Sequence, residues 1–222
     1  MMRAVLFDAY GTLFDVHSVV ALAERMFPGR GVALSQAWRS KQLEYTWLRT
    51  LSGRYRDFWN VTGDALAYAV AALQLPATGA QQSQLLDAYL SLEPFPENLE
   101  VLRQLHRSGL VLGTLSNGTL SMLEAALASA GMRELFTHVL SVDSVRRYKT
   151  DPSAYKLGTD AVGLPAADIA FVSSNCWDAI GASWHGYRTF WVNRSGAPLD
   201  RLGVTPDATG GSLRDLIAFL QQ

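Results

Sequence analysis

The second half of the chain alternates short apolar runs with segments of helical periodicity, and this pattern restricts the possible folds more than any other feature. Apolar runs occur at residues 110–115, 139–141, 169–172 and 189–192, and the segments between them repeat their apolar residues with helical spacing. Such alternation predicts parallel strands joined by helical crossovers. The expected fold class is therefore α/β with a parallel-sheet core.

The first ninety residues combine one predicted strand with a long helical stretch. The strand, at residues 4–7, ends at Asp8 and is followed by Gly11. From residue 15 to residue 92 the apolar positions repeat with helical spacing, and turn residues divide the stretch into several helices. We therefore expect a core domain formed by residues 1–14 and 93–222, with residues 15–92 inserted as a smaller helical domain.

Composition excludes several classes of function. The 19 basic and 20 acidic residues give a net charge of -1, which provides no excess charge to attract nucleic acid or an anionic membrane. The single cysteine, Cys176, excludes an internal disulfide and a cysteine-cluster zinc site, and the four histidines lack ligand spacing. No apolar stretch approaches the roughly 18 residues that a membrane span needs. We expect a cytoplasmic protein that binds a small neutral or anionic ligand.

Polar side chains follow the predicted strands at the points where these end. Asp8 follows the first strand, Ser116 and Asn117 follow a second, and the polar segment 173–178 follows a later one. The carboxyl ends of parallel strands share one edge of a sheet, where ligands bind in open α/β folds. A buried carboxylate such as Asp8 needs nearby donors, although a strand-end aspartate also serves as a turn residue. Ser116, Asn117 or Thr119 is equally consistent with capping the next helix.

Lys149 lies in a loop before a predicted helix that contains Tyr155. A lone lysine in a loop is most often a solvated surface charge. If the strand ends converge, however, Lys149 shares a site with Asp8 and Asp178. One lysine between two carboxylates can stabilise a nucleophilic carboxylate and orient a water molecule.

Together these motifs resemble the haloacid dehalogenase superfamily over nearly the whole chain. The resemblance rests on segments 8–12 and 116–118, on Lys149 and on segment 173–178. Most members are magnesium-dependent phosphatases that have a second aspartate two positions after the nucleophile and an acidic metal ligand in the last motif. These positions hold Tyr10 and Ser174 here. Because phosphoryl transfer needs a metal to offset charge, both differences disfavour that activity.

Within the superfamily, segments 7–16, 38–47 and 173–178 are similar to the L-2-haloacid dehalogenases. That branch has a Rossmann-like core, a helical cap inserted after the first strand and usually a homodimeric assembly. The resemblance implies hydrolysis of L-2-haloacids to D-2-hydroxyacids through an ester on the nucleophile. It implies a small 2-haloacid and a halide ion as ligands, with no metal, nucleic acid or membrane involved. A magnesium-dependent phosphatase and a non-catalytic binding protein remain the alternatives.

The resemblance also implies roles for individual residues. Asp8 would be the nucleophile, and Arg39 would reach from the cap to accept the halide beside Asn117. The remaining catalytic or supporting residues would be Thr12, Ser116, Lys149, Tyr155, Ser173, Asn175 and Asp178, and the substrate would contact Tyr10, Leu43, Phe58, Asn117 and Trp177. Either Asp178 or Lys149 would activate the water. Ser40 stands where the branch has glutamine, and the sequence leaves open whether this difference alters the polarity of the pocket.

Overall fold

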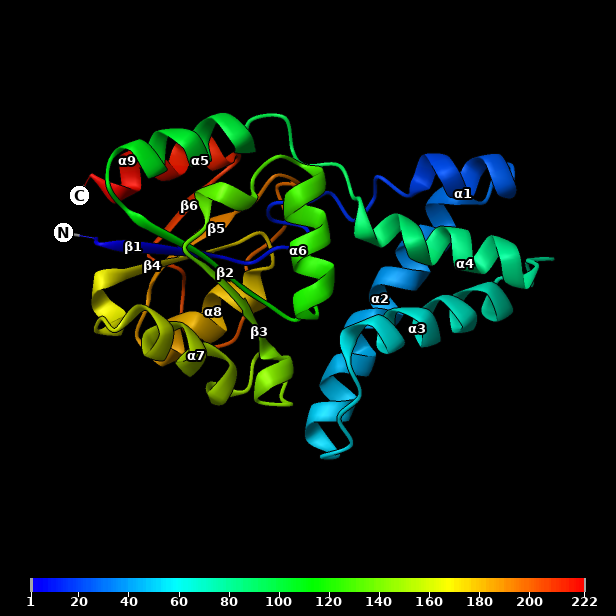
Figure 1. Ribbon diagram of the computed structural model, residues 1–222. Coiled ribbons are helices and arrows are strands. Elements are labelled where there is room, and N and C mark those ends of the chain that lie inside the picture. Colours follow the sequence, from blue (N-terminus) through cyan, green and yellow to red (C-terminus); the bar gives the residue numbers. More distant parts are fainter. Residues whose placement is uncertain (1, 222) are drawn as a thin grey trace.

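One parallel sheet organises residues 2–221, the part of the chain that this computed structural model describes (Figure 1). Its strand order is β3-β2-β1-β4-β5-β6. The strands are β1 (Ala4–Phe7), β2 (Val111–Ser116), β3 (His138–Ser141), β4 (Ile169–Ser173), β5 (Arg188–Val192) and β6 (Ala208–Gly210). Every strand pairs in parallel with its neighbours. The predicted α/β class is confirmed.

Helices cover both faces of the sheet, as parallel connections require. They are α5 (Asn98–Arg107), α6 (Leu120–Ser129), α7 (Pro152–Val162), α8 (Cys176–His185) and α9 (Leu216–Leu220). In Figure 1, α5 and α9 lie on one side of the sheet and α7 and α8 on the other. Val5 and Phe7 of β1 belong to one apolar cluster and Leu6 to a second cluster with Tyr155. Successive side chains of a strand face opposite sides of the sheet. Since both sides are covered by helices, every residue of β1 is apolar.

The helix that follows Lys149 has strong start and stop signals in its sequence. The Asp151 side chain caps α7 by accepting a hydrogen bond of 2.9 Å from the Ser153 amide, and Pro152 occupies the first turn. Gly163 ends the helix in a left-handed conformation, with φ of 69°. These signals fix where α7 begins and hence how Tyr155 is placed relative to Lys149.

A second group of helices lies between β1 and α5 in the chain and to one side of the sheet in Figure 1. These helices are α1 (Val20–Met26), α2 (Gly31–Leu51), α3 (Phe58–Ala72) and α4 (Gly79–Asp87). They account for the helical stretch predicted between residues 15 and 92, and the assignment of domains at these bounds stays a prediction. No helix in residues 2–221 is long and apolar enough to cross a membrane.

Two elements near the C-terminus, β6 and α9, were not predicted. The sequence of β6, Ala-Thr-Gly, contains no apolar run, and its pairing with β5 defines it as a strand. Helix α9 is five consecutive apolar residues, a run too short for periodicity to distinguish strand from helix. Both assignments depend on contacts with distant parts of the chain.

Candidate active site

Asp8 lies at the carboxyl end of β1, which has β2 on one side and β4 on the other. The crossovers from this strand lead to both sides of the sheet, and such a position is where open α/β sheets bind ligands. The Asp8 main-chain N–H donates to the carbonyl of Val172 in β4 at 2.9 Å. Gly11, with φ of 99°, then turns the chain back. The side chain of Asp8 is only 9% exposed.

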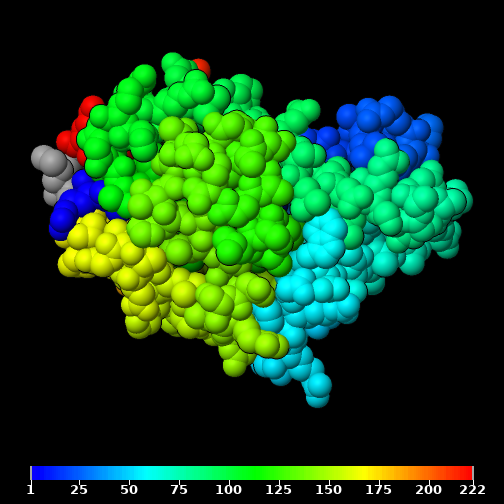
Figure 2. Space-filling view, in the orientation of Figure 1, coloured from blue at the N-terminus to red at the C-terminus, as the bar shows by residue number. Residues whose placement is uncertain are grey.

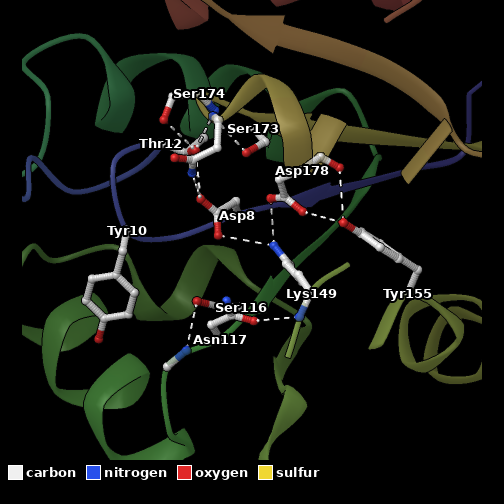
Figure 3. Close-up of polar contacts among 12 residues, drawn as sticks. Asp8, Tyr10, Thr12, Ser116, Asn117, Lys149, Tyr155, Ser173, Ser174 and Asp178 are labelled. Atoms are coloured by element: carbon white, nitrogen blue, oxygen red, sulfur yellow. Dashed lines mark hydrogen bonds and ion pairs between the residues drawn. The ribbon is translucent and has the colours of Figure 1, made fainter. Parts of the chain in front are cut away.

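The two carboxylate oxygens of Asp8 have different hydrogen-bond donors (Figure 3). Oδ1 accepts from the Lys149 ammonium at 3.1 Å. Oδ2 accepts from the Thr12 hydroxyl at 3.1 Å and from the Asn175 amide at 3.2 Å. These donors stabilise negative charge on a largely buried carboxylate.

Lys149 is 1% exposed and lies between two carboxylates. Besides Asp8, its ammonium donates to Asp178 Oδ2 at 2.9 Å, and it lies 4.8 Å from the centre of the Phe171 ring. Burial alone would lower the pKa of Lys149, but attraction to Asp178 and Asp8 outweighs burial and raises that pKa. Its main-chain N–H donates to Asn117 Oδ1 at 3.0 Å, which fixes the loop. Lys149 is therefore a buried lysine paired with two carboxylates rather than a solvated surface charge.

Asp178, in the first turn of α8, is fully buried. Its Oδ1 accepts from the Tyr155 hydroxyl at 2.8 Å. Burial raises the pKa of Asp178, against the opposing effects of Lys149 and Tyr155. Helix α8 approaches Tyr155 closely because residue 181 is glycine, and a Cβ there would collide with the Tyr155 hydroxyl. A fully buried carboxylate with a raised pKa is suited to accept a proton.

The loop between β4 and α8 positions two of the Asp8 donors. The Ser174 main-chain N–H donates to the Thr12 hydroxyl oxygen at 2.8 Å, and Asn175 N–H donates to Ser173 Oγ at 3.1 Å. The Thr12 hydroxyl has two acceptors for its one proton, Asp8 Oδ2 at 3.1 Å and Ser174 Oγ at 3.2 Å. Ser174, which was not predicted as a site residue, thus orients Thr12 through its main chain.

The loop after β2 lies on the other side of Lys149 (Figure 3). Ser116 is buried and its Oγ accepts from the Gly118 N–H at 3.2 Å. Thr119, not Ser116 or Asn117, caps α6 by accepting from the Met122 N–H at 3.3 Å. The capping alternative is therefore wrong for Ser116 and Asn117, which are left to shape the site.

Two predicted site residues, Arg39 and Leu43, come from α2, one of the helices between β1 and α5. Arg39 Nη2 donates to the carbonyl of Tyr10 at 3.2 Å. Arg39, Leu43 and Asn175 line one cavity of about 350 Å³. Because Asn175 also donates to Asp8, this cavity lies close to the Asp8 carboxylate.

The aromatic residues predicted to contact substrate do not lie together: Tyr10 and Phe58 pack on each other, and Trp177 lines a separate cavity. Tyr10 packs on Phe58 with ring centres 5.6 Å apart, and in Figure 3 its ring is directed away from the Asp8 carboxylate. Trp177 instead lines a different cavity, of about 500 Å³, together with Lys149 and Trp47. The structure thus brings the predicted polar residues together around Asp8. Leu43 and Trp177 line different cavities, whereas Tyr10 and Phe58 pack on each other and line neither of the two.

Comparisons with known proteins agree with this geometry. The family model for haloacid dehalogenase-like hydrolases matches residues 2–186. An (S)-2-haloacid dehalogenase from Pseudomonas sp. strain YL is 47% identical over 220 residues, covering 99% of this chain and 95% of the relative. The chain belongs to the haloacid dehalogenase-like hydrolases and, within them, to the L-2-haloacid dehalogenases.

Solved structures of this family share the complete fold. A crystal structure of an L-2-haloacid dehalogenase, 57% identical, aligns with a TM-score of 0.97 over 100% of this chain and 99% of the other. The L-2-haloacid dehalogenase from Xanthobacter autotrophicus with chloropropionic acid covalently bound is 39% identical, with a TM-score of 0.93 over 100% and 99% of the two chains. The predicted family and fold are confirmed.

Two further positions in this dehalogenase differ from expectation. Ser40, which stands where the branch has glutamine, is exposed on α2. Gln42, which was not predicted, is fully buried and accepts from Arg39 Nη1 at 2.7 Å. Its only signal in the sequence is its position three residues after Arg39, on the same face of a predicted helix.

The described residues contain no cluster of three or more histidine, cysteine, aspartate or glutamate side chains with the geometry to hold a metal ion. The cation beside both Asp8 and Asp178 is the Lys149 ammonium. Tyr10 and Ser174 contribute main-chain groups to the site, as acceptor for Arg39 and donor to Thr12.

Proposed function

We propose that this dehalogenase hydrolyses L-2-haloacids to D-2-hydroxyacids through an ester on Asp8. The observation that carries the proposal is the set of donors on Asp8, where Lys149 holds one oxygen and Thr12 and Asn175 hold the other. A buried carboxylate fixed in this way has both its charge and its direction set before substrate binds. The covalently bound chloropropionic acid in the Xanthobacter relative is consistent with such an ester.

In the first step one Asp8 oxygen attacks C2 of the haloacid in line with the carbon–halogen bond. The new carbon–oxygen bond forms as the halogen leaves with its electron pair, and the configuration at C2 inverts. Arg39, which lines the cavity beside Asn175, stabilises the negative charge that develops on the halide. The Ser116 hydroxyl and nearby main-chain N–H groups bind the substrate carboxylate.

In the second step water attacks the carbonyl carbon of the Asp8 ester. The bond between C2 and oxygen stays intact, so the D configuration is retained in the product. Asp178 takes the proton from this water, since its pKa is raised, whereas the raised pKa of Lys149 keeps that residue protonated. Tyr155 orients Asp178 through its hydroxyl.

The inserted helices at residues 15–92 act as the cap in this proposal, and residues 1–14 and 93–222 form the core. The contact that supports this division of roles is between Arg39 on α2 and the Tyr10 carbonyl at the edge of the sheet. The cap supplies the halide acceptor, and the core supplies both carboxylates. Substrate therefore lies between them, next to Leu43 and Asn175.

We further propose that the enzyme is a cytoplasmic homodimer. The single cysteine is unpaired, as expected in a reducing compartment. Near its C-terminal end helix α2 exposes Leu48 and Leu51, the latter being 84% exposed, and exposed apolar residues that lie together often form an interface. Light scattering should give twice the monomer mass for the wild type, and the monomer mass for Leu48→Glu/Leu51→Glu.

The activity is tested by chloride release from L- and D-2-chloropropionate, with a chelator present, for the wild type and Asp8→Asn. We expect chloride from the L isomer alone, D-lactate as product, and a loss of at least about a thousandfold in the variant. Activity that needs magnesium, with hydrolysis of a phosphate ester, would indicate the phosphatase alternative. A folded wild type that releases no chloride from either isomer would indicate a binding protein.

A further inference from the structure

A chain of hydrogen bonds runs from Arg39 into the interior between α2 and α3. Arg39 Nη1 donates to Gln42 Oε1 at 2.7 Å, and Gln42 Nε2 donates to Thr62 Oγ1 at 2.7 Å. The Thr62 hydroxyl donates in turn to the carbonyl of Phe58 at 2.6 Å. Gln42 and Thr62 are fully buried, so each group in the chain depends on its partner in place of water.

The direction of these bonds determines which atom of Gln42 faces Arg39. The Thr62 hydroxyl has one proton, and that proton is donated to Phe58. Thr62 can therefore only accept from Gln42, which must present its NH₂ group to Thr62 and its oxygen to Arg39. If the amide were reversed, an N–H of Gln42 would face an N–H of Arg39, and both would lose a partner at a buried position.

The same bonds fix the orientation of the Arg39 guanidinium. Gln42 accepts from Nη1 and the Tyr10 carbonyl accepts from Nη2, so the two terminal nitrogens are held at separate points. The guanidinium is planar and carries five N–H groups in a rigid arrangement, and holding two of them directs the others. Arg39 lines the 350 Å³ cavity that Asn175 also lines.

We propose that Gln42 is a positioning residue that aims the Arg39 guanidinium at the departing halide and thereby sets how far the enzyme depends on leaving-group quality. The proposal rests on the proposed function, in which Arg39 accepts the halide. Chloride is a poorer leaving group than bromide, so its departure needs more stabilisation of developing charge. A misdirected Arg39 should therefore slow reaction of chlorinated substrates more than of brominated ones.

The test compares kcat/KM for L-2-bromopropionate and L-2-chloropropionate in variants of this chain. Gln42→Leu removes the acceptor for Arg39 with a side chain of similar size. Thr62→Val removes the acceptor that orients Gln42, and Thr62→Ser restores the hydroxyl. Thr46→Val is the matched control, because Thr46 is a buried threonine like Thr62, but it lies on α2 and donates only to the Leu43 carbonyl.

We expect Gln42→Leu to raise the bromide-to-chloride ratio of kcat/KM by about tenfold, since Arg39 remains present but is no longer held. Thr62→Val should raise the ratio by a smaller factor, and Thr62→Ser should restore it. Thr46→Val should leave the ratio at the wild-type value. Equal loss of kcat/KM for both substrates in Gln42→Leu and Thr62→Val would overturn the proposal and leave Gln42 with a role in packing alone.

Bromide binding separates failure of this proposal from failure of the proposed function. Added bromide should raise the melting temperature of the wild type, and Gln42→Leu should abolish that rise while Thr46→Val retains it. A wild type that releases no halide overturns the proposed function, yet loss of the bromide effect in Gln42→Leu would still support the aiming of Arg39 toward an anion. If added bromide raises the melting temperature equally in the wild type and in Gln42→Leu, the positioning role of Gln42 is overturned.

Discussion

Two aspartates share one lysine at this site, and their surroundings give them different chemistry. Asp8 accepts from Lys149, Thr12 and Asn175 beside a cavity. Asp178 is fully buried and accepts from Lys149 and Tyr155. In the proposed mechanism the carboxylate next to the cavity acts as nucleophile, and the one enclosed by protein, with its pKa raised by burial, acts as base.

Replacing the base should separate the two steps of the reaction. Asp178→Asn leaves Asp8 able to attack C2 but removes the group that deprotonates water, so the ester should accumulate. Intact-protein mass spectrometry after mixing with L-2-chloropropionate should detect the adduct, with turnover reduced at least about a hundredfold. Circular dichroism controls for folding. A folded variant that is inactive and forms no adduct would place Asp178 in the first step instead.

The raised pKa of Asp178 predicts the acid limb of the pH profile. Turnover requires the ionised carboxylate, so kcat should fall as the pH drops through a value above 3.8, the ordinary aspartate value. Tyr155→Phe removes a donor that favours the ionised form and should move this limb to higher pH. The pKa of Lys149 is raised above 10.5, so kcat is not expected to fall on the alkaline side below that pH. An unchanged acid limb in Tyr155→Phe would contradict this assignment.

At the scale of elements, the close packing of α7 against α8 depends on the absence of a side chain at position 181. A Cβ there would meet the Tyr155 hydroxyl and the side chain of Thr150. The same contact carries the hydrogen bond from Tyr155 to Asp178. Helix packing and orientation of the base therefore depend on the same glycine.

Gly181→Ala should destabilise the protein by about 1–3 kcal/mol, because the added methyl group forces two packed helices apart. Gly79→Ala is the matched control, since Gly79 is an exposed residue in the first turn of α4 with open space around it. It should be neutral or more stable by up to about 1 kcal/mol. Urea unfolding of the two variants measures both effects. Equal stabilities would show that α7 and α8 can move apart without cost.

The elements that the sequence predicted are those whose patterns are local. Strand β1 has an apolar run ended by Asp8, and α7 has Asp151, Pro152 and Gly163 at its ends. Convergence of Asp8, Lys149 and Asp178 followed from the rule that parallel strands end at one edge. Strand β6 and the Gln42 contact escaped prediction, because an edge pairing and a buried hydrogen bond leave no periodic trace.

At the scale of the whole molecule, the end of α2 and the following loop contact the segment just before Lys149. In Figure 2 the cyan part of the helical insertion lies against the yellow-green part of the core. The Tyr148 hydroxyl donates to the Arg56 carbonyl at 2.6 Å, and the Tyr55 hydroxyl donates to Asp143 at 2.7 Å. Tyr148 immediately precedes Lys149, so the inserted helices also support the lysine.

Tyr148→Phe should lower the free energy of unfolding by about 1 kcal/mol, because the Arg56 carbonyl loses its donor. For a chain of this size that corresponds to a melting temperature lower by about 2–4 °C. Tyr68→Phe, at an exposed tyrosine of α3, should change stability by less than about 0.5 kcal/mol. Calorimetry on both variants measures the difference. An unchanged melting temperature for Tyr148→Phe would mean that this contact contributes nothing to stability.

The unequal donors on the two Asp8 oxygens have a consequence for isotope labelling. Those donors can prevent the Asp8 carboxylate from rotating about its Cβ–Cγ bond between catalytic cycles. The oxygen at one fixed position then attacks in every cycle. That oxygen leaves with the product, and an oxygen from solvent replaces it. In ¹⁸O water each enzyme molecule would then release one unlabelled hydroxyacid and only labelled ones afterwards. If the carboxylate rotates, both original Asp8 oxygens are eventually transferred, and each enzyme molecule releases two unlabelled hydroxyacid molecules in total. Counting unlabelled product per enzyme molecule therefore measures how firmly the site holds its nucleophile.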